Sequence, residues 1–262
     1  MEKAIISFSF DDGRMDNYTI AYPIMKKLGI PATFNITTGF VEGKFEDGRL
    51  THAKPMIMDM VRELYYDPEI EIAGHGYWHE NTLDDILKGV KCLIEKIGLK
   101  NLSTQIGFAS PGTSLDLNYY QTIKNELNNH NICYIRLSKR YLSYPLLKVL
   151  CRKLNRFFHW PYMFKLAYQD TLMDGVHDNL LYSVPVMAST TVEEIKALIN
   201  KAVKEKKACI LMWHSIVHKN DVRDNFDFDV RKFEEICVWL KELQDQGNLS
   251  ICKTMELYNQ LL

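Results

Sequence analysis

Residues 4–13 read Ala-Ile-Ile-Ser-Phe-Ser-Phe-Asp-Asp-Gly, an apolar run that ends in two acids and a glycine. The first seven residues predict a strand buried on both faces, as in a parallel sheet covered by helices. Asp11 and Asp12 stand where this strand ends, and Gly13 permits a sharp turn. Active sites of α/β barrels are built from polar residues in this position. The stretch therefore predicts the fold class and one edge of a candidate site, although a solvated loop or a helix cap has the same residue pattern.

The rest of the chain repeats this strand pattern, with helical patterns between the strands. A capping signal begins a helix at Thr82, a capping box within residues 190–194 begins another, and Gly29 and Gly98 end two helices. Repeated strand–helix units favour a closed or nearly closed α/β barrel, with an open doubly wound sheet as the alternative. The predicted strands are 4–10, 32–37, 69–73, 105–108, 132–137, 180–184, 208–213 and 249–252, and the predicted helices are 20–28, 55–66, 82–97, 190–206 and 229–246.

Composition narrows the function classes. The 262 residues carry 32 Lys and Arg against 33 Asp and Glu, with 47% hydrophobic and 25% charged residues, which indicates an ordinary globular chain. The near-zero net charge gives no general case for nucleic-acid binding. The chain has no run of about 20 apolar residues that would span a membrane. No Pro/Gly/Ser-rich linker divides it, so we expect a single domain over residues 1–262.

Two further features bear on location. The chain enters a predicted strand almost at once, with no signal-peptide pattern, so we expect a cytoplasmic protein. None of the six cysteines forms a C-x-x-C pair, so we expect buried free thiols in a reducing compartment. The cysteines are Cys92, Cys133, Cys151, Cys209, Cys237 and Cys252.

Histidines follow two other predicted strands. The sequence Ala73-Gly-His75-Gly-Tyr-Trp-His79 places two imidazoles four residues apart, so that both reach one metal ion if the segment is turn-like, with a carboxylate as the usual third ligand. Surface histidines are the alternative. His214 follows the apolar strand 208–213. Because the carboxyl ends of parallel strands meet at one rim, the acids and histidines are expected to converge there.

The order of these motifs resembles the polysaccharide deacetylase family, the NodB-homology carbohydrate esterases of family 4, over nearly the whole chain. Ser9-Phe-Asp-Asp-Gly13 is similar to its Thr-Phe-Asp-Asp-Gly motif, and His75-Gly-Tyr-Trp-His79 is similar to His-Ser/Thr-x-x-His. Three supporting segments resemble the second strand of the family, its Arg-x-Pro-Tyr motif and its Leu-x-His motif. They are Pro31-Ala-Thr-Phe34, Phe108-Ala-Ser-Pro-Gly112 and Leu211-Met-Trp-His214.

The resemblance implies a distorted (β/α)7 barrel that uses a divalent metal to hydrolyse the N-acetyl group of an acetylated sugar. It implies that the metal is bound by Asp12, His75 and His79. Zinc is favoured, and cobalt and nickel also suit two imidazoles and a carboxylate. By the same resemblance Asp11 is the general base, and His214 is the general acid that protonates the leaving amine.

The third motif adds a supporting role. Pro111 and Gly112 are its supporting residues, and a backbone N–H near Gly112 is expected to help to hold the oxyanion, with the metal as the main stabiliser.

Three departures from the family pattern accompany the resemblance. Gly76 replaces a hydroxyl residue that braces the histidine loop, so another group must orient the ligands. Ala109 stands where the family has an arginine beside the base, and Arg136, at the end of another predicted strand, is a candidate replacement. The acid that orients His214 is not recognisable. Its candidates are Asp170, Asp174 and Asp178, with Asp174 favoured.

One segment breaks the even charge distribution. Between His130 and Gln169 the chain has eight basic residues and no acid, interleaved with aromatics, so the remaining 24 of the 32 basic residues stand against all 33 acids. We expect an inserted helical flap near 138–168. It is either a solvated element packed on the barrel or a surface that meets anionic lipid or a lipid-linked glycan, which would place the protein at the inner face of a membrane. The basic residues are Arg136, Lys139, Arg140, Lys148, Arg152, Lys153, Arg156 and Lys165.

The leading functional hypothesis is a metal-dependent sugar N-deacetylase with an N-acetylated polysaccharide, oligosaccharide or lipid-linked glycan precursor as its substrate. One alternative is a hydrolase of a different non-peptide C–N bond in a small molecule. The other is a non-catalytic glycan-binding relative, which the missing motif arginine favours and the intact Asp11, His75 and His79 disfavour.

Overall fold

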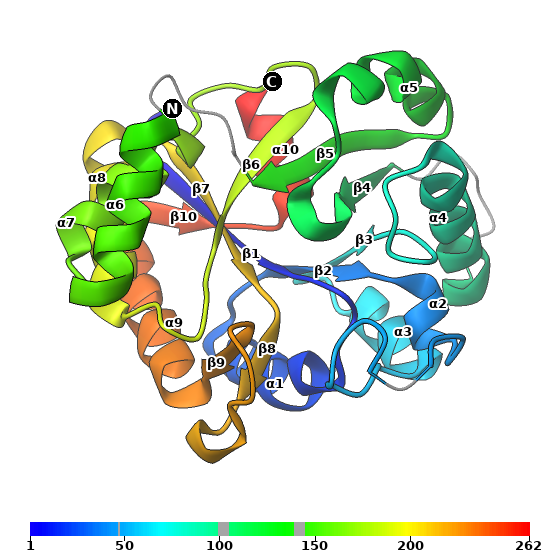
Figure 1. Cartoon of the computed structure of the whole chain (residues 1–262), viewed down its shortest axis with the longest axis horizontal. Helices are drawn as coiled ribbons and strands as arrows, with labels where there is room; N and C mark the ends of the chain where they lie inside the picture. The colour runs from blue at the N-terminus through cyan, green and yellow to red at the C-terminus, as the bar shows by residue number, and fades with distance from the viewer. Residues whose placement is uncertain (47, 99–104, 139–144) are drawn as a thin grey trace.

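In the computed structural model, β1 (Ala4–Phe10) lies at the centre of a parallel sheet that closes into a barrel (Figure 1). The structure describes all residues except 47, 99–104 and 139–144, and it describes only the backbone of 145, 147, 148, 152 and 156. The other strands of the sheet are β2 (Ala32–Ile36), β3 (Ile70–Gly74), β4 (Ile106–Ala109), β5 (Ile132–Ser138), β6 (Leu180–Pro185), β7 (Ala208–Trp213) and β10 (Leu249–Ile251).

The barrel closes because β7 pairs with β1 along Ile5–Phe10. On the other side of β1, two strands share one edge. β10 pairs with Ala4, Ile5 and Ile6, whereas β2 pairs with Ser9 and Phe10. The predicted distorted seven-stranded barrel is therefore confirmed, and the open sheet is excluded.

Helices surround the barrel, and the predicted ones are present within a few residues of their expected bounds. Thr82 caps α4 through its hydroxyl, Gly98 ends that helix at φ 85°, and Thr191 rather than Thr190 caps α8. The helices are α1 (Tyr22–Leu28), α2 (Thr38–Val41), α3 (Met58–Tyr66), α4 (Leu83–Ile97), α5 (Leu117–Asn129), α6 (Pro145–Phe158), α7 (Pro161–Tyr168), α8 (Val192–Glu205), α9 (Val230–Asp245) and α10 (Thr254–Leu261).

Sequence reasoning missed α2, α5, α10 and a small sheet of β8 (Ser215–Val217) and β9 (Asp227–Asp229). The sequence of α5, Leu-Asn-Tyr-Tyr-Gln-Thr-Ile-Lys-Asn-Glu-Leu-Asn-Asn, buries only Tyr120, Ile123 and Leu127, so its apolar stripe is too sparse to stand out.

The two faces of β1 divide the core. Phe8 and Phe10 pack against Phe233 of α9, at ring-centroid distances of 6.2 and 6.0 Å, so they face the helix layer. Because side chains alternate along a strand, Ser7 and Ser9 face the interior of the barrel. There the Ser9 hydroxyl accepts a hydrogen bond from Asn35 on β2 at 2.8 Å. The interior of the barrel is therefore polar at Ser9 and Asn35, next to the two acids at the end of β1.

The helical segment predicted near 138–168 is the pair α6 and α7 in the connection between β5 and β6. Figure 1 shows this pair beside α8 on one side of the barrel. Cys151 of α6 and Phe164, Ala167 and Tyr168 of α7 belong to the main hydrophobic core. The predicted residues Lys139, Arg140, Tyr141 and Tyr144 lie outside the described part of the chain. Among the described helices, none combines the length and apolar character needed to cross a bilayer.

Candidate metal centre and active site

The carboxyl end of β1 carries the two adjacent acids. Asp12 and Gly13 have φ angles of 74° and 82°, so the chain turns sharply directly after Asp11. Backbone hydrogen bonds hold this turn, from the Thr37 N–H to the Asp12 carbonyl at 3.2 Å and from the Met56 N–H to the Gly13 carbonyl at 2.8 Å. Both carboxyl groups are buried, and the turn directs them to different partners.

Asp12 lies against the two histidines that follow β3. Its Oδ1 atom is 3.4 Å from His75 Nε2 and 3.5 Å from His79 Nε2, and one donor atom from each of the three residues lies within 4.8 Å of the others. Bonds of about 2.0–2.1 Å to a tetrahedral ion place ligand atoms roughly 3.3–3.4 Å apart. The spacing to Asp12 therefore fits a small divalent cation such as zinc.

The two histidines differ in protonation. His75 Nδ1 donates to the Ala109 carbonyl oxygen at 2.8 Å, which directs Nε2 at Asp12. Burial opposes it, but the charge of Asp11 and the hydrogen bond to Asp12 raise the pKa of His75, so a metal would bind at Nε2 in place of a proton. Burial, together with the charge of His75, lowers the pKa of His79 to about 4. His79 is therefore neutral at pH 7 and free to coordinate.

Arg14 fixes the metal-facing orientation of Asp12. Its Nε and Nη2 atoms lie 2.9 and 2.8 Å from Asp12 Oδ2, which leaves Oδ1 directed at the histidines. Although burial opposes it, hydrogen bonding to His75 and the charge of Arg14 hold the pKa of Asp12 well below its usual value. Arg14 also donates to the Ser215 hydroxyl at 2.9 Å, which ties the ligand to β8. Sequence reasoning missed Arg14, whose only signal was its place directly after the Asp-Asp-Gly motif.

Asp85, in the first turn of α4, braces the histidine loop. Its carboxylate accepts hydrogen bonds from the N–H groups of Tyr77 at 3.1 Å, Trp78 at 2.7 Å and Glu80 at 3.0 Å. A Cβ atom on Gly76 would lie 2.5 Å from Asp85 Oδ2, and the φ of Gly76 is +80°. A buried carboxylate therefore occupies the place where a side chain at position 76 would stand. Asp85 is the group that orients the histidine loop in the absence of a hydroxyl residue at position 76.

Asp11 has a separate set of partners. Its Oδ1 atom accepts hydrogen bonds from Arg136 Nη2 and, at 2.8 Å, from Asn35 Nδ2. Arg136 also donates to the Ser183 hydroxyl at 3.1 Å, and its side chain is 1% exposed. Burial raises the pKa of Asp11, but the charge of Arg136, followed by those of His75 and His214, brings it below its ordinary value. The structure thus places the guanidinium of β5 beside the first acid, while Asn35 was missed.

His214 stands at the carboxyl end of β7, with its ring 4.6 Å from that of Phe226. Burial lowers its pKa, against the opposing charges of Asp12 and Asp11. Its Nδ1 atom is buried and has no hydrogen-bond partner among the residues that the structure describes.

The prediction that Asp174 orients His214 is wrong. Asp174 is exposed and pairs with Lys207 at 3.5 Å, beside the bridge between Met173 and Ala208 at the amino end of β7. The six residues of β7 put about 20 Å between its ends. Asp178 is no better placed, because it pairs with Lys124 at the amino end of β6.

Pro111 and Gly112 lie in the short helical turn that follows β4. The Ser110 hydroxyl donates to Asn81 Oδ1 at 2.8 Å, and Asn81 Nδ2 donates to the Pro111 carbonyl at 2.9 Å. This turn therefore supports the end of the histidine loop through Asn81.

His52, Asp224 and Asp227 form a second group of metal-ligand types. Its geometry differs from that of the first group, because His52 faces Asp224 with Nδ1 and Asp227 with Nε2, each at 3.1 Å. Two ring nitrogens on two carboxylates suit an imidazole bridging two loops rather than a shared ion. The bridge holds the loop that carries Phe226 against His214.

Comparisons with known proteins agree with this geometry. A family model described as polysaccharide deacetylase matches residues 1–131, half of the chain, which includes Asp11, Asp12 and both loop histidines. No curated protein matches the chain.

Two solved structures that align over nearly the whole chain show the same fold at low identity. A Mycobacterium smegmatis protein described as a polysaccharide deacetylase is 13% identical over 100% of this chain and 91% of its own, with a TM-score of 0.55. The Xyl-CE4 domain of a multidomain xylanase from the hindgut metagenome of Trinervitermes trinervoides is 16% identical over 99% and 91%, with a TM-score of 0.51. IcaB from Ammonifex degensii aligns over 49% of this chain and 57% of its own, at 22% identity and a TM-score of 0.40.

Proposed function

Because the chain belongs to the polysaccharide deacetylase family, we propose that it is a metal-dependent hydrolase that removes the N-acetyl group of an acetylated sugar. The observation that carries the proposal is the buried set of Asp12, His75 and His79 with Asp11 beside it. Asp12 lies in the position of a metal ligand, whereas Arg136 keeps Asp11 ionised, so the two acids can perform different tasks.

The residues divide the reaction between them. A divalent cation bound by Asp12, His75 and His79, with zinc favoured, would polarise the acetyl carbonyl and make a bound water more acidic. Asp11, kept ionised by Arg136 and oriented by Asn35, accepts the proton of the water that attacks the carbonyl carbon.

The C–N bond then breaks as the imidazolium of His214 gives its proton to the leaving nitrogen, and acetate and a free amine depart. Burial lowers the pKa of His214 below its ordinary value, against the charges of Asp12 and Asp11, so the imidazolium is the minor form in the free protein at pH 7. The turn at Pro111 and Gly112 is the candidate for a backbone donor to the oxyanion.

The test is acetate release from a panel of N-acetylhexosamine oligomers and small N-acetyl amides. The protein is first stripped with a chelator and then given zinc, cobalt or nickel. We expect acetate only from the sugars and only after metal is restored. Release from small amides alone would make the protein a hydrolase of a different C–N bond. No release from any substrate, with metal bound, would make it a non-catalytic relative.

A further inference from the structure

The outer face of α6 and α7 exposes large apolar side chains. On α6, Leu146 is 85% and Phe157 83% exposed, and Val149 and Leu150 are about half exposed. Their spacing of three, four and eleven residues from Leu146 puts them on one face of the helix. Phe158, Trp160 and Tyr162 extend this exposed surface past the end of α6 and into α7. We call these seven residues the apolar face.

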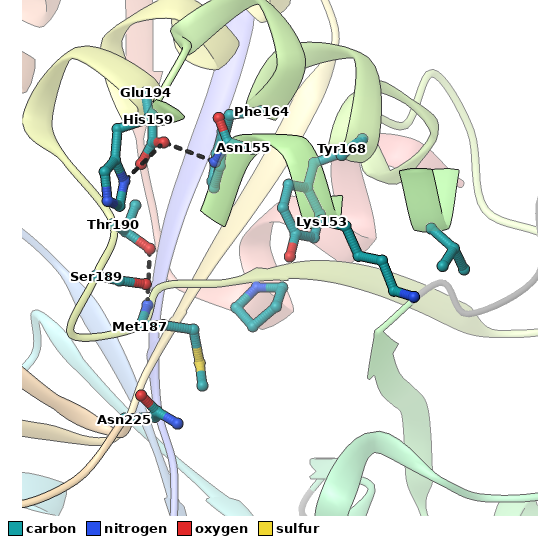
Figure 2. A pocket seen from close by; sticks show the side chains of 13 residues that line it. Lys153, Asn155, His159, Phe164, Tyr168, Met187, Ser189, Thr190, Glu194 and Asn225 are labelled. Carbon is teal, nitrogen blue, oxygen red and sulfur yellow. Dashed lines mark hydrogen bonds and ion pairs between the residues drawn. The ribbon is translucent and has the colours of Figure 1, made fainter. Parts of the chain in front are cut away.

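The apolar face is not a loose part of the core, because the opposite side of the pair is anchored. Asn155 Nδ2 donates to the buried Glu194 of α8 at 2.6 Å, and the Glu194 carboxylate also lies 3.6 Å from His159 Nδ1 (Figure 2). Cys151, Phe164 and Tyr168 are buried on the same side. The two helices are therefore fixed on the barrel by one side, and the apolar face is on their exposed side.

The chemistry of the face matches a membrane interface. Phe158 and Trp160 stack at 5.0 Å, and Lys165 Nζ lies 4.7 Å from the ring centre of Tyr162. Aromatic residues with a polar tip, flanked by lysines, are typical of the boundary between lipid tails and headgroups.

The positive charge of residues 130–169 favours a membrane with anionic lipids. Apart from the buried Arg136, residues 130–169 carry seven Lys and Arg and no acid, whereas the rest of the chain is acidic. Lys153 is exposed on α6, seven residues after Leu146, and so lies on the same side of the helix as Leu146. We propose that the apolar face docks on an anionic lipid bilayer and lies in its headgroup region. A second copy of the chain is disfavoured as the occupant, because two segments of the same positive charge repel each other.

A cavity of about 260 Å³ separates α6 and α7 from the loop after β6, and Val149 and Lys153 line it on the side of the apolar face. Asn225 lines its other side, as Figure 2 shows, and is the neighbour of Phe226, whose ring contacts His214. The cavity therefore lies between the helix pair and the loop that carries Phe226, the ring neighbour of His214.

The test is co-sedimentation of the full chain with vesicles of phosphatidylcholine and phosphatidylglycerol in equal parts, and with vesicles of phosphatidylcholine alone. We expect binding to the anionic vesicles that weakens at high salt. Phe157→Ser is expected to lower the partition coefficient about tenfold, from the apolar area withdrawn from lipid. Tyr66→Ser, on α3 with 73% exposure, is the matched control and is expected to change nothing.

A charge pair completes the design. Lys153→Gln is expected to lower binding to anionic vesicles about fivefold, and Lys91→Gln, an exposed lysine of α4, is expected to leave it unchanged. Circular dichroism checks that all variants are folded. Absence of wild-type binding to anionic vesicles overturns the proposal. So does a dimer in light scattering that Phe157→Ser dissolves, because the face would then belong to a second copy. Neither outcome depends on deacetylase activity.

Discussion

Arg136→Met removes the cation that faces the proposed base. The side chains of Arg136 and Asp11 are 1% and 2% exposed. The value of about 0–1 kcal/mol that surface ion pairs contribute to stability therefore does not apply to this buried pair. Removing one partner of a buried pair leaves an uncompensated charge and costs about 3–5 kcal/mol. We therefore expect a loss of unfolding free energy in that range.

The same substitution is expected to slow catalysis. Without the guanidinium, burial dominates and raises the pKa of Asp11, so less of the base is ionised at neutral pH. The acidic limb of kcat/KM should move to higher pH, which acetate release measured across the pH range detects. Lys241→Met, which breaks the exposed pair with Asp245, is the control and should cost less than about 1 kcal/mol.

A double variant separates stability from activity. Asp11→Asn combined with Arg136→Met removes both charges, so urea unfolding should show it to be more stable than Arg136→Met alone, although it releases no acetate. If Arg136→Met loses less than about 1 kcal/mol of unfolding free energy and keeps the wild-type pH profile, the pair neither stabilises the fold nor keeps Asp11 ionised.

Three other substitutions probe the supports of the site. Asp85→Asn leaves one acceptor oxygen for three N–H groups, so calorimetry should show zinc affinity about 10–100-fold lower; unchanged affinity would remove Asp85 from the bracing role. Asp16 accepts a hydrogen bond at 2.9 Å from the Ser215 hydroxyl, the group to which Arg14 donates. Burial raises the pKa of Asp16 to about 6, above its unfolded value of 3.8, so its contribution to stability is present at low pH and lost as the pH rises through 6. Asp16→Asn should therefore gain on wild type, by at most about 3 kcal/mol, in urea unfolding at pH about 7 relative to pH about 4, and a constant difference would contradict this. His214→Gln should keep zinc binding but lower kcat about 100-fold or more, and acetate release near the wild-type rate would exclude His214 as the acid.

The elements that sequence reasoning found are those with strong local signals. The strand before Asp11 is apolar throughout, and Thr82 and Gly98 carry unambiguous capping chemistry, so β1 and α4 were predicted nearly to the residue. The sparse stripe of α5 and the three-residue strands β8 and β9 have no comparable pattern.

The supports of the site depend on contacts that no local pattern encodes. Asp85 looks like an ordinary first-turn acid of a helix, yet its carboxylate caps the histidine loop. Asn35 and Arg14 reach the two acids only after the barrel closes. Asp174 was favoured from its place in the sequence, and the length of β7 separates it from His214. Arg136 could be suggested because a strand-end arginine points to the same rim.

The central claim is that Asp12 and the histidines hold a metal while the adjacent Asp11 performs chemistry. Zinc titration by calorimetry, paired with acetate release, tests it on three proteins: wild type, Asp11→Asn and His79→Ala. We predict that Asp11→Asn binds zinc as wild type does but releases no acetate, and that His79→Ala loses zinc and activity together. Full activity in Asp11→Asn, or undiminished zinc binding in His79→Ala, would contradict it.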